Sequence, residues 1–286
     1  MTYLRDEIAS QPACWERAAS MAGSVASVLP APGERVAMIG CGTSYYMAQS
    51  YAALRGGVTD AWPASEFTDR GYDRVIALTR SGTTSEVLAA LERVPAGVPT
   101  VAITADASTP IASAAGSLVT LDFADERSVV QTRFATSALV LLRASLGEDV
   151  SALGAAAALS SPLAQALVDA SQVTFLGTGW TIGLANEAAL KLREAAQAWT
   201  ESYYAMEYRH GPISIAAPGR AVWIFGPAPE GLVAELRGIG AHVEQWTAGD
   251  PLADLIRAHR LAEAVASAQG LNPDQPRNLT RSVILA

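Results

Sequence analysis

The chain has 286 residues, half of them apolar, and a formal net charge of −8 at pH 7. This composition predicts a globular protein with a sizeable core, and the absence of any basic run argues against nucleic acid or an anionic membrane as a partner. The N-terminal stretch carries charges where a signal peptide has an apolar core, and no apolar run approaches a bilayer span, so we expect a cytoplasmic protein.

Cysteine and histidine are scarce, which bears on metal binding. Cys14 and Cys41 are too few for a disulfide framework, and we expect both to be reduced, with Cys41 a packing residue rather than a nucleophile. The chain has three histidines and no Cys/His cluster, so we expect no metal site. His242 and His259 stand in polar helical surroundings, which predicts that both are solvated.

Residues 1–27 are predicted to form an N-terminal amphipathic helix that is broken at Pro12. After them come short, β-branched apolar runs separated by Ala- and Leu-rich helical segments. The runs are VAMIG, RVIALT, PTVAIT, SLVTLD, VTFLG and AVWIFG. This alternation predicts an α/β protein whose parallel strands are covered by helices on both faces.

An internal sequence repeat divides the chain into two halves. The stretch Glu34–Leu54 and the stretch Ser171–Leu192, offset by 137 residues, share one plan of an apolar run, Gly-x-Gly and an Ala-rich helix. We therefore predict a first α/β domain over 28–150 and a second over 151–286, the latter beginning with a connector helix.

The two Gly-x-Gly turns match the dinucleotide-binding fingerprint poorly. In the first copy Tyr45 stands at the third glycine position, and in the second copy Gly183 comes one residue too late. A tight strand-to-helix turn explains the glycines as well as a ligand would.

A stronger motif follows the apolar run 74–78, where hydroxyl side chains crowd the turn TRSGTTS before a helix opens at Glu86. Hydroxyls and unpaired backbone N–H groups at a helix N-terminus favour a phosphate. An N-cap would need only one of these hydroxyls. The corresponding turn of the second half carries prolines instead, so only the first half retains this predicted phosphate site. Thr43 and Ser44, at the neighbouring strand end, should face the same crevice.

Lys191 is the only lysine among 20 fixed cations. On a helix, Glu187, Lys191 and Glu194 fall on one face. A solvated Glu–Lys pair is the simplest interpretation of such a triplet. The use of Arg everywhere else favours a second one, in which a compact ammonium that donates in three directions is needed here. His210 follows shortly, before a Gly-Pro turn that can project an imidazole.

Taken together, the stretches GCGTS, ASEF, LTRSGTTSE, EAALKLRE, EYRHGP and DQPRNL resemble the sugar isomerase (SIS) family in its double-domain form, along nearly the whole chain. The resemblance extends to the isomerase half of glutamine–fructose-6-phosphate aminotransferase and to related isomerases and amino-sugar-phosphate deaminases. It implies two tandem SIS domains, each a flavodoxin-like three-layer αβα sandwich, and a reaction that needs no metal or organic cofactor.

The resemblance also implies a role for each motif residue. Glu194 matches the residue that shuttles a proton between C1 and C2 of the open-chain sugar, with Glu187 and Lys191 as its helix companions. His210 matches the histidine that opens the sugar ring, often from the partner subunit of a homodimer. The residues matched to substrate binding are Thr43, Ser44, Thr79, Arg80, Ser81, Thr84, Gln131 and Thr132.

Three functions remain open. The first is a deaminating isomerase that converts an amino-sugar 6-phosphate to a ketose 6-phosphate and ammonia. The second is an aldose–ketose isomerase without deamination, and the third is a sensor that binds phosphosugars without turnover. The motifs do not separate the first two, because both use the same proton shuttle.

Overall fold

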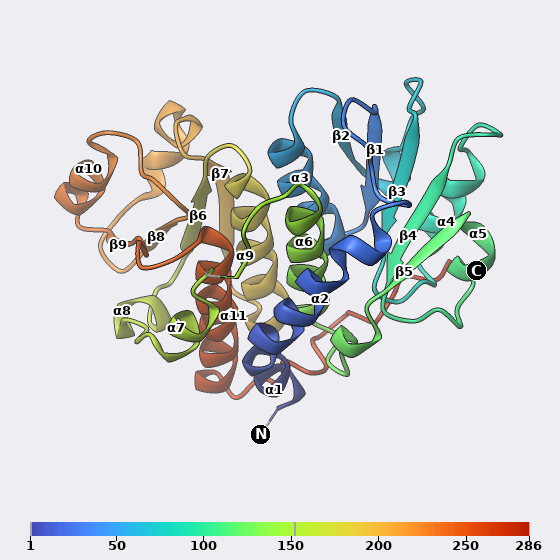
Figure 1. Cartoon of the computed structure of the whole chain (residues 1–286). Coiled ribbons are helices and arrows are strands. Elements are labelled where there is room, and N and C mark those ends of the chain that lie inside the picture. Colours follow the sequence, from blue (N-terminus) through green and yellow to red (C-terminus); the bar gives the residue numbers. More distant parts are fainter. Residues whose placement is uncertain (1, 152, 286) are drawn as a thin grey trace. The chain divides into compact units, whose positions relative to one another are not determined.

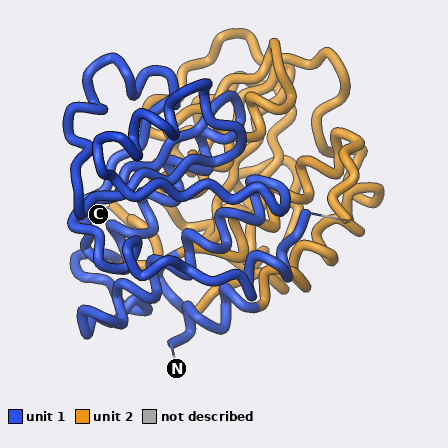
Figure 2. The backbone as a smooth tube through the Cα atoms, turned by 90° about the vertical axis from the view of Figure 1, so that its left-hand side faces the viewer, with its two compact units in different colours: residues 1–9, 128–130, 152–279 blue, residues 10–127, 131–151, 280–286 orange. Residues whose placement is uncertain are grey.

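The computed structural model describes residues 2–151 and 153–285, which form an α/β protein with two parallel sheets (Figure 1). The chain divides into two compact units that interleave along the sequence. Unit 1 comprises 1–9, 128–130 and 152–279, and unit 2 comprises 10–127, 131–151 and 280–286 (Figure 2). Each unit contains one sheet.

The sheet of unit 2 has five parallel strands in the order β2-β1-β3-β4-β5, which is the flavodoxin-like order. The strands are β1 (Val36–Gly40), β2 (Thr59–Pro63), β3 (Arg74–Leu78), β4 (Thr100–Thr104) and β5 (Ser117–Thr120). β1, β3 and β4 are buried almost throughout, because helices cover both faces of the sheet.

Helices lie on both sides of this sheet (Figure 1). The unit contains α2 (Gln11–Val25), α3 (Thr43–Arg55), α4 (Ser85–Glu92), α5 (Ile111–Ala114) and α6 (Arg133–Ser145), with the 3-10 turns η1 (Ala64–Glu66) and η2 (Asp122–Ala124). α3 packs on β1 and β2, and α6 packs on both α3 and α2. On the other face, Val87 and Leu91 of α4 join Ile39 and Val75 in one apolar cluster.

The sheet of unit 1 has four parallel strands in the order β7-β6-β8-β9. They are β6 (Val173–Gly177), β7 (Thr200–Tyr204), β8 (Ala221–Ile224) and β9 (His242–Glu244). This order matches the order β2-β1-β3-β4 in the other sheet, as the internal sequence repeat predicts.

The helices of unit 1 also flank its sheet. They are α1 (Tyr3–Ala9), α7 (Ala155–Ser160), α8 (Gln165–Val168), α9 (Thr181–Ala196), α10 (Leu232–Ile239) and α11 (Pro251–Ala268), with the 3-10 turns η3 (Glu207–His210) and η4 (Pro212–Ile215). α9 packs on β6 and β7, and α11 packs against α9. Leu232 and Leu236 of α10 pack with Val222 and Ile224 of β8.

The predicted fold class, parallel sheets flanked by helices, is confirmed. The predicted boundary near residue 150 separates the two sheets, but the compact units do not follow it at the chain ends. Residues 1–9 cluster with the second sheet, whereas 10–27 and 280–286 cluster with the first. The N-terminal segment forms two helices, α1 and α2, and Pro12 lies in the first turn of α2. Among the described residues no helix has the length and apolarity needed to cross a membrane.

Candidate active site

The turn from β1 into α3 brings backbone groups very close together. A Cβ on Gly40 would lie 2.8 Å from the carbonyl carbon of Ser44, so only glycine fits there. Gly42 precedes the helix with φ of 54°, which also favours glycine. Thr43 and Ser44 open α3 and are both buried. The glycines of this motif therefore have a structural explanation of their own.

The turn from β3 into α4 is held by its own hydroxyl groups. The Thr79 hydroxyl accepts from the backbone N–H of Gly82 at 3.3 Å, and the Ser81 hydroxyl accepts from that of Thr83 at 3.3 Å. The hydroxyls of Ser81 and Thr84 lie 3.4 Å apart. These contacts gather the hydroxyls of Thr79, Ser81 and Thr84 in the turn that precedes α4, and the N-terminus of a helix is where an anion is favoured.

This turn forms one wall of a small pocket in unit 2. The pocket is lined by Cys41, Ser44, Leu78, Thr79, Arg80, Ser81, Thr84, Val87, Gln131 and Arg281. Six of the eight residues that the resemblance assigns to substrate binding are thus brought together. The side-chain oxygen of Gln131 is buried without a hydrogen-bond partner among the described residues, so it can accept from a hydroxyl that enters the pocket.

Arg80 supplies a buried cation to the pocket wall. The residue is 2% exposed, and its Nη1 lies 3.7 Å from Oε2 of Glu126, whose side chain is also fully buried. Its Nη2 donates to the backbone carbonyl of Arg281 at 3.2 Å. A buried guanidinium held in place by a carboxylate is suited to a charged ligand, because little rotamer entropy remains to be lost on binding.

Two residues that the resemblance assigns to the substrate do not line the pocket. The Thr132 hydroxyl donates to Glu126 Oε1 at 2.8 Å, and the Thr132 backbone N–H donates to the same oxygen. Thr132 therefore organises the start of α6 beside the pocket. Thr43 is buried next to Ser44 at the start of α3. A substrate role for either stays a prediction.

The C-terminal segment 280–285, which sequence reasoning did not connect with this site, lies on the turn. The Ser282 hydroxyl is 2.9 Å from that of Thr83, and the backbone N–H of Ser85 donates to the Val283 carbonyl at 3.1 Å. Arg281 is bonded to the backbone of Glu126 and to Asp125. No periodicity links residues about 200 positions apart, so local patterns could not reveal this contact.

Cys41 lies in the same pocket but is poorly suited to act as a nucleophile. Burial raises the pKa of its thiol to about 11, and the neighbouring Glu86 adds to the increase. At neutral pH the thiolate is therefore a minute fraction of the population, which agrees with the packing role predicted for this residue.

In unit 1, the turn from β6 into α9 repeats the close approach seen after β1. A Cβ on Gly177 would lie 2.4 Å from the carbonyl oxygen of Thr181. The sequence of α9, rich in Ala and Leu, has high helix propensity, and the helix ends where Gln197 adopts a left-handed conformation with φ of 53°.

One face of α9 carries a buried charge cluster. Lys191 is fully buried, and its ammonium contacts Oε2 of Glu194 and lies 3.6 Å from Oε1 of Glu187. The Glu187 side chain is 1% exposed, whereas that of Glu194 is 20% exposed. The simpler interpretation, a solvated Glu–Lys pair, is therefore excluded. The ammonium is shared by two carboxylates, of which only Glu194 is open to solvent.

His259 belongs to this cluster, and the prediction that it is solvated is wrong. The residue lies on α11 with its side chain fully buried, and its Nε2 lies 3.8 Å from Oε1 of Glu187. Burial, together with the charge of Lys191, lowers the pKa of His259 well below its ordinary value. The imidazole is therefore neutral at pH 7. His242 is partly exposed and lies 3.7 Å from Glu244.

His210 ends the short turn η3 and is exposed. Gly211 follows it with φ of 135°, a conformation that favours glycine and lets the chain turn sharply after the imidazole. His210 makes no hydrogen bond or ion pair within the described part of the chain. Its assignment to ring opening stays a prediction.

The described residues contain no group of three or more His, Cys, Asp or Glu side chains that could hold a metal ion. The side chains in the β3–α4 turn, on α9 and at the end of η3 supply hydroxyls, a guanidinium group, a carboxylate beside an ammonium, and an imidazole.

Comparisons with known proteins bear on this arrangement. No family model matches the chain. In an alignment of 316 positions that covers 87% of its length, the chain is 28% identical to a glutamine–fructose-6-phosphate aminotransferase (isomerising) of Zymomonas mobilis. The chain spans between 24% and 52% of the length of the curated aminotransferases that it matches.

Two solved structures have a similar fold over nearly the whole chain. Glucosamine-6-phosphate deaminase from Thermotoga maritima has a TM-score of 0.75 and 24% identity, with 99% of this chain and 100% of that chain covered. Tagatose-6-phosphate ketose/aldose isomerase from Escherichia coli has a TM-score of 0.80 and 20% identity, with 96% and 95% covered.

The fold is thus similar to that of phosphosugar isomerases and deaminases. The chain's relatives are isomerising aminotransferases, and its structural neighbours are phosphosugar isomerases and deaminases. The resemblance to the sugar isomerase (SIS) family that the motifs predict is confirmed by these relatives and structural neighbours.

Proposed function

We propose that the protein isomerises a sugar 6-phosphate between its aldose and ketose forms. The observation that carries this proposal is the α9 cluster, in which a fully buried ammonium is shared between a buried carboxylate, Glu187, and a solvent-accessible one, Glu194. An isolated helix pair would not be buried in this way, since removing charges from water costs several kcal/mol per ion. Such an arrangement is expected where a carboxylate must be held in one orientation.

In the proposed reaction Glu194 removes the proton from C2 of the open-chain aldose, and an enediol forms as the carbonyl oxygen takes up a proton. Glu194 then returns a proton to C1 while the C2 hydroxyl loses its proton to solvent, which leaves the carbonyl at C2. A positioned acid or base of this kind contributes about 10² to 10⁴ in rate. Glu187 and Lys191 keep the Glu194 carboxylate in place, and His210 exchanges the proton of the ring oxygen when the sugar ring opens.

The phosphate group would bind at the turn 79–84. Support comes from the hydroxyls of Thr79, Ser81 and Thr84, which line one pocket with the buried guanidinium of Arg80. Ser44 lies on the same wall, and the buried oxygen of Gln131 would accept from a sugar hydroxyl. We propose that this half-site and the Glu194 half-site serve one substrate molecule, and that the two units are tandem SIS domains.

We further propose that the preferred substrate is an amino-sugar 6-phosphate and that ammonia is released. With nitrogen on C2, the same proton transfer leaves an imine at C2, which water hydrolyses to a ketose and ammonia. Support comes from a structural neighbour that is a glucosamine-6-phosphate deaminase and from relatives that are isomerising aminotransferases. An isomerase without deamination is the second candidate, supported by the tagatose-6-phosphate isomerase neighbour.

A panel of sugar 6-phosphates and amino-sugar 6-phosphates, screened by thermal shift, tests this function. A ligand that binds only the folded protein raises the melting temperature, by an amount that increases with its concentration relative to the dissociation constant. Each hit is then assayed for ketose and for ammonia. Ketose with ammonia supports the deaminating isomerase, and ketose alone supports the second candidate. Binding without any product would support a sensor and contradict both.

A further inference from the structure

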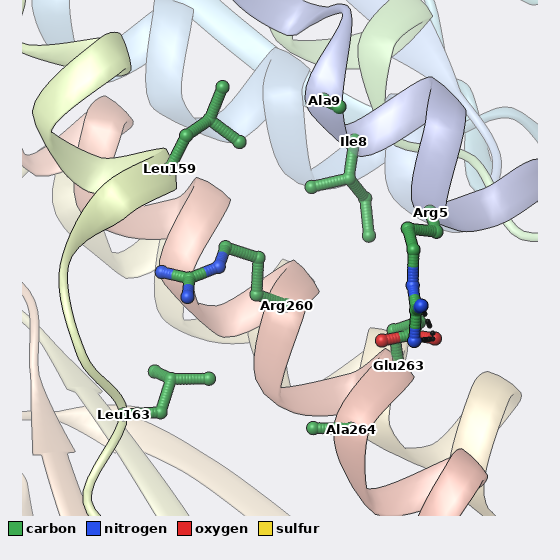
Figure 3. A pocket seen from close by; sticks show the side chains of 8 residues that line it. All are labelled: Arg5, Ile8, Ala9, Leu159, Leu163, Arg260, Glu263 and Ala264. Atoms are coloured by element: carbon green, nitrogen blue, oxygen red, sulfur yellow. Dashed lines mark hydrogen bonds and ion pairs between the residues drawn. The ribbon is translucent and has the colours of Figure 1, made fainter.

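A cavity in unit 1, lined by none of the predicted site residues, has the size and lining of a ligand pocket. It lies between α1, α11 and the segment around α7 (Figure 3), and its volume is about 350 Å³. Pockets for small molecules have volumes of about 300–1,000 Å³. Its apolar walls are formed mainly by Ile8, Leu159 and Leu163. The polar side chains among its described lining residues are Arg5, Arg260 and Glu263.

The cavity carries one uncompensated cation. Arg260, on α11, is partly buried, and its Nη1 donates to the backbone carbonyls of Ala158 at 2.8 Å and Ser161 at 2.6 Å. Within the described residues Arg260 forms no ion pair, and no hydrogen bond engages its Nε or Nη2. Burial, and next the charge of Arg257, lower the pKa of Arg260. The carboxylates of Glu244 and Asp254 are both paired with Arg257.

The other charges at the cavity cancel each other. Arg5 of α1 contacts Glu263 of α11 at 2.7 Å, and Glu263 also accepts from the hydroxyl of Ser267. Figure 3 shows this pair on one side of the cavity, while the guanidinium of Arg260 extends toward the side that carries Leu159 and Leu163. The cavity therefore presents one net positive charge beside apolar walls.

We propose that this cavity binds a small organic carboxylate with an apolar body, a ligand class different from the phosphosugar substrate. The carboxylate accepts from Nε and Nη2 of Arg260, a geometry that suits a planar guanidinium fork. The apolar body packs against Leu159, Leu163 and Ile8. Arg260 directly follows His259 on α11, so the ligand site and the buried cluster of α9 share one helix.

Calorimetric titration of the full-length protein with straight-chain carboxylates tests the proposal. Hexanoate and octanoate should bind once per chain, with affinity rising about fourfold for each methylene that the cavity buries. Acetate, which lacks the apolar body, and 1-hexanol, which lacks the charge, should bind at least about tenfold more weakly than hexanoate. No detectable hexanoate binding to the wild-type protein would overturn the proposal.

Variants locate the site. Arg260→Gln should weaken hexanoate binding by about tenfold or more, whereas Arg260→Lys should retain most of it, since a charged hydrogen bond is preserved. Arg237→Gln, which removes an exposed arginine from α10, is the matched control and should leave the affinity unchanged.

Leu163→Trp fills the cavity without changing its charge, so it tests the site even if Arg260→Gln fails to fold. It should abolish hexanoate binding. Equal affinity for hexanoate in the wild type, Arg260→Gln and Leu163→Trp would mean that hexanoate binds elsewhere, as an adventitious additive only. An apparent affinity that falls as the protein concentration rises would mean that a second copy of the chain covers the cavity. Either result would overturn the proposal.

Discussion

At the scale of single residues, Lys191 is the group whose replacement should have the largest effect. Lys191→Met leaves the buried carboxylate of Glu187 without its cation and should destabilise the protein by about 3–5 kcal/mol in urea unfolding. Lys191→Arg keeps the charge but must fit a larger planar group into a closed site, which should cost about 1–3 kcal/mol and reduce turnover. Arg193→Lys, on the exposed side of the same helix, is the control. A Lys191→Arg variant with full activity would contradict the need for an ammonium.

The depressed pKa of His259 predicts how stability depends on pH. Below about pH 6.5 the unfolded chain binds a proton at this histidine while the folded protein does not, so stability is fully present above that pH and is lost as the pH falls. His259→Gln should flatten the pH dependence of the unfolding free energy below about pH 6.5. Identical slopes in the wild type and His259→Gln would refute this interpretation.

The residues that sequence reasoning brought together are those that follow consecutive strand ends. Ser44, Thr79 and Ser81 reach one pocket because parallel strands deliver their carboxyl ends to the same edge of a sheet. His259 was misjudged because its burial depends on how α11 packs against α9, which no local pattern encodes. Arg281 was missed because it lies far along the chain from the turn that it joins.

At the scale of secondary-structure elements, every apolar run that predicts a strand corresponds to one in the structure. The strands that were missed are β2, β7 and β9, which are only partly buried and lack a continuous apolar run. β2 ends in Pro63, a residue usually confined to edge strands, and it does lie at the sheet edge. Strand prediction from apolar runs finds the buried centre of each parallel sheet and the edge strand β5, and it misses the other edge strands.

The turn that opens α4 should depend on glycine at position 82. Gly82 has φ of 62°, and a Cβ there would lie 2.0 Å from the Thr109 hydroxyl oxygen. Gly82→Ala should therefore destabilise the protein by about 2–4 kcal/mol in thermal unfolding and weaken phosphosugar binding. Gly97 also has positive φ, of 89°, but open space around it, so Gly97→Ala should cost only about 1 kcal/mol. Equal losses for the two variants would show that crowding at this turn is unimportant.

At the scale of the whole molecule, we propose a homodimer in which His210 acts in the partner's site. Its exposure, with no partner in the described chain, supports this proposal. The test is to mix two variants, His210→Gln and Glu194→Gln, each inactive by itself. Random reassociation would then restore one intact site in each mixed dimer, or about one quarter of the wild-type activity. No recovery in dimers shown to have exchanged subunits would place His210 in the site of its own chain.

The two-sheet organisation could be predicted from the repeated strand–Gly-x-Gly–helix plan, because a repeated local pattern folds into a repeated unit. The assignment of the chain ends could not. Residues 1–9 belong to unit 1, whose sheet comes later in the sequence, and residues 280–286 belong to unit 2, whose sheet comes first. Such exchanges are decided by packing between segments that are remote in sequence, which composition and periodicity do not record.

The central claim is that the hydroxyl-lined turn and Glu194 act on one phosphosugar. Incorporation of solvent deuterium at C1 and C2 of a sugar 6-phosphate, followed by NMR in D₂O, tests it most directly. The wild type should exchange these positions with the phosphorylated sugar and far more slowly with the free sugar. Glu194→Gln should lose at least about 10²-fold in rate, and Ser81→Asp should raise the concentration needed for half-maximal exchange by repelling the phosphate. Exchange that survives in Glu194→Gln, or that is equally fast without the phosphate, would contradict the account.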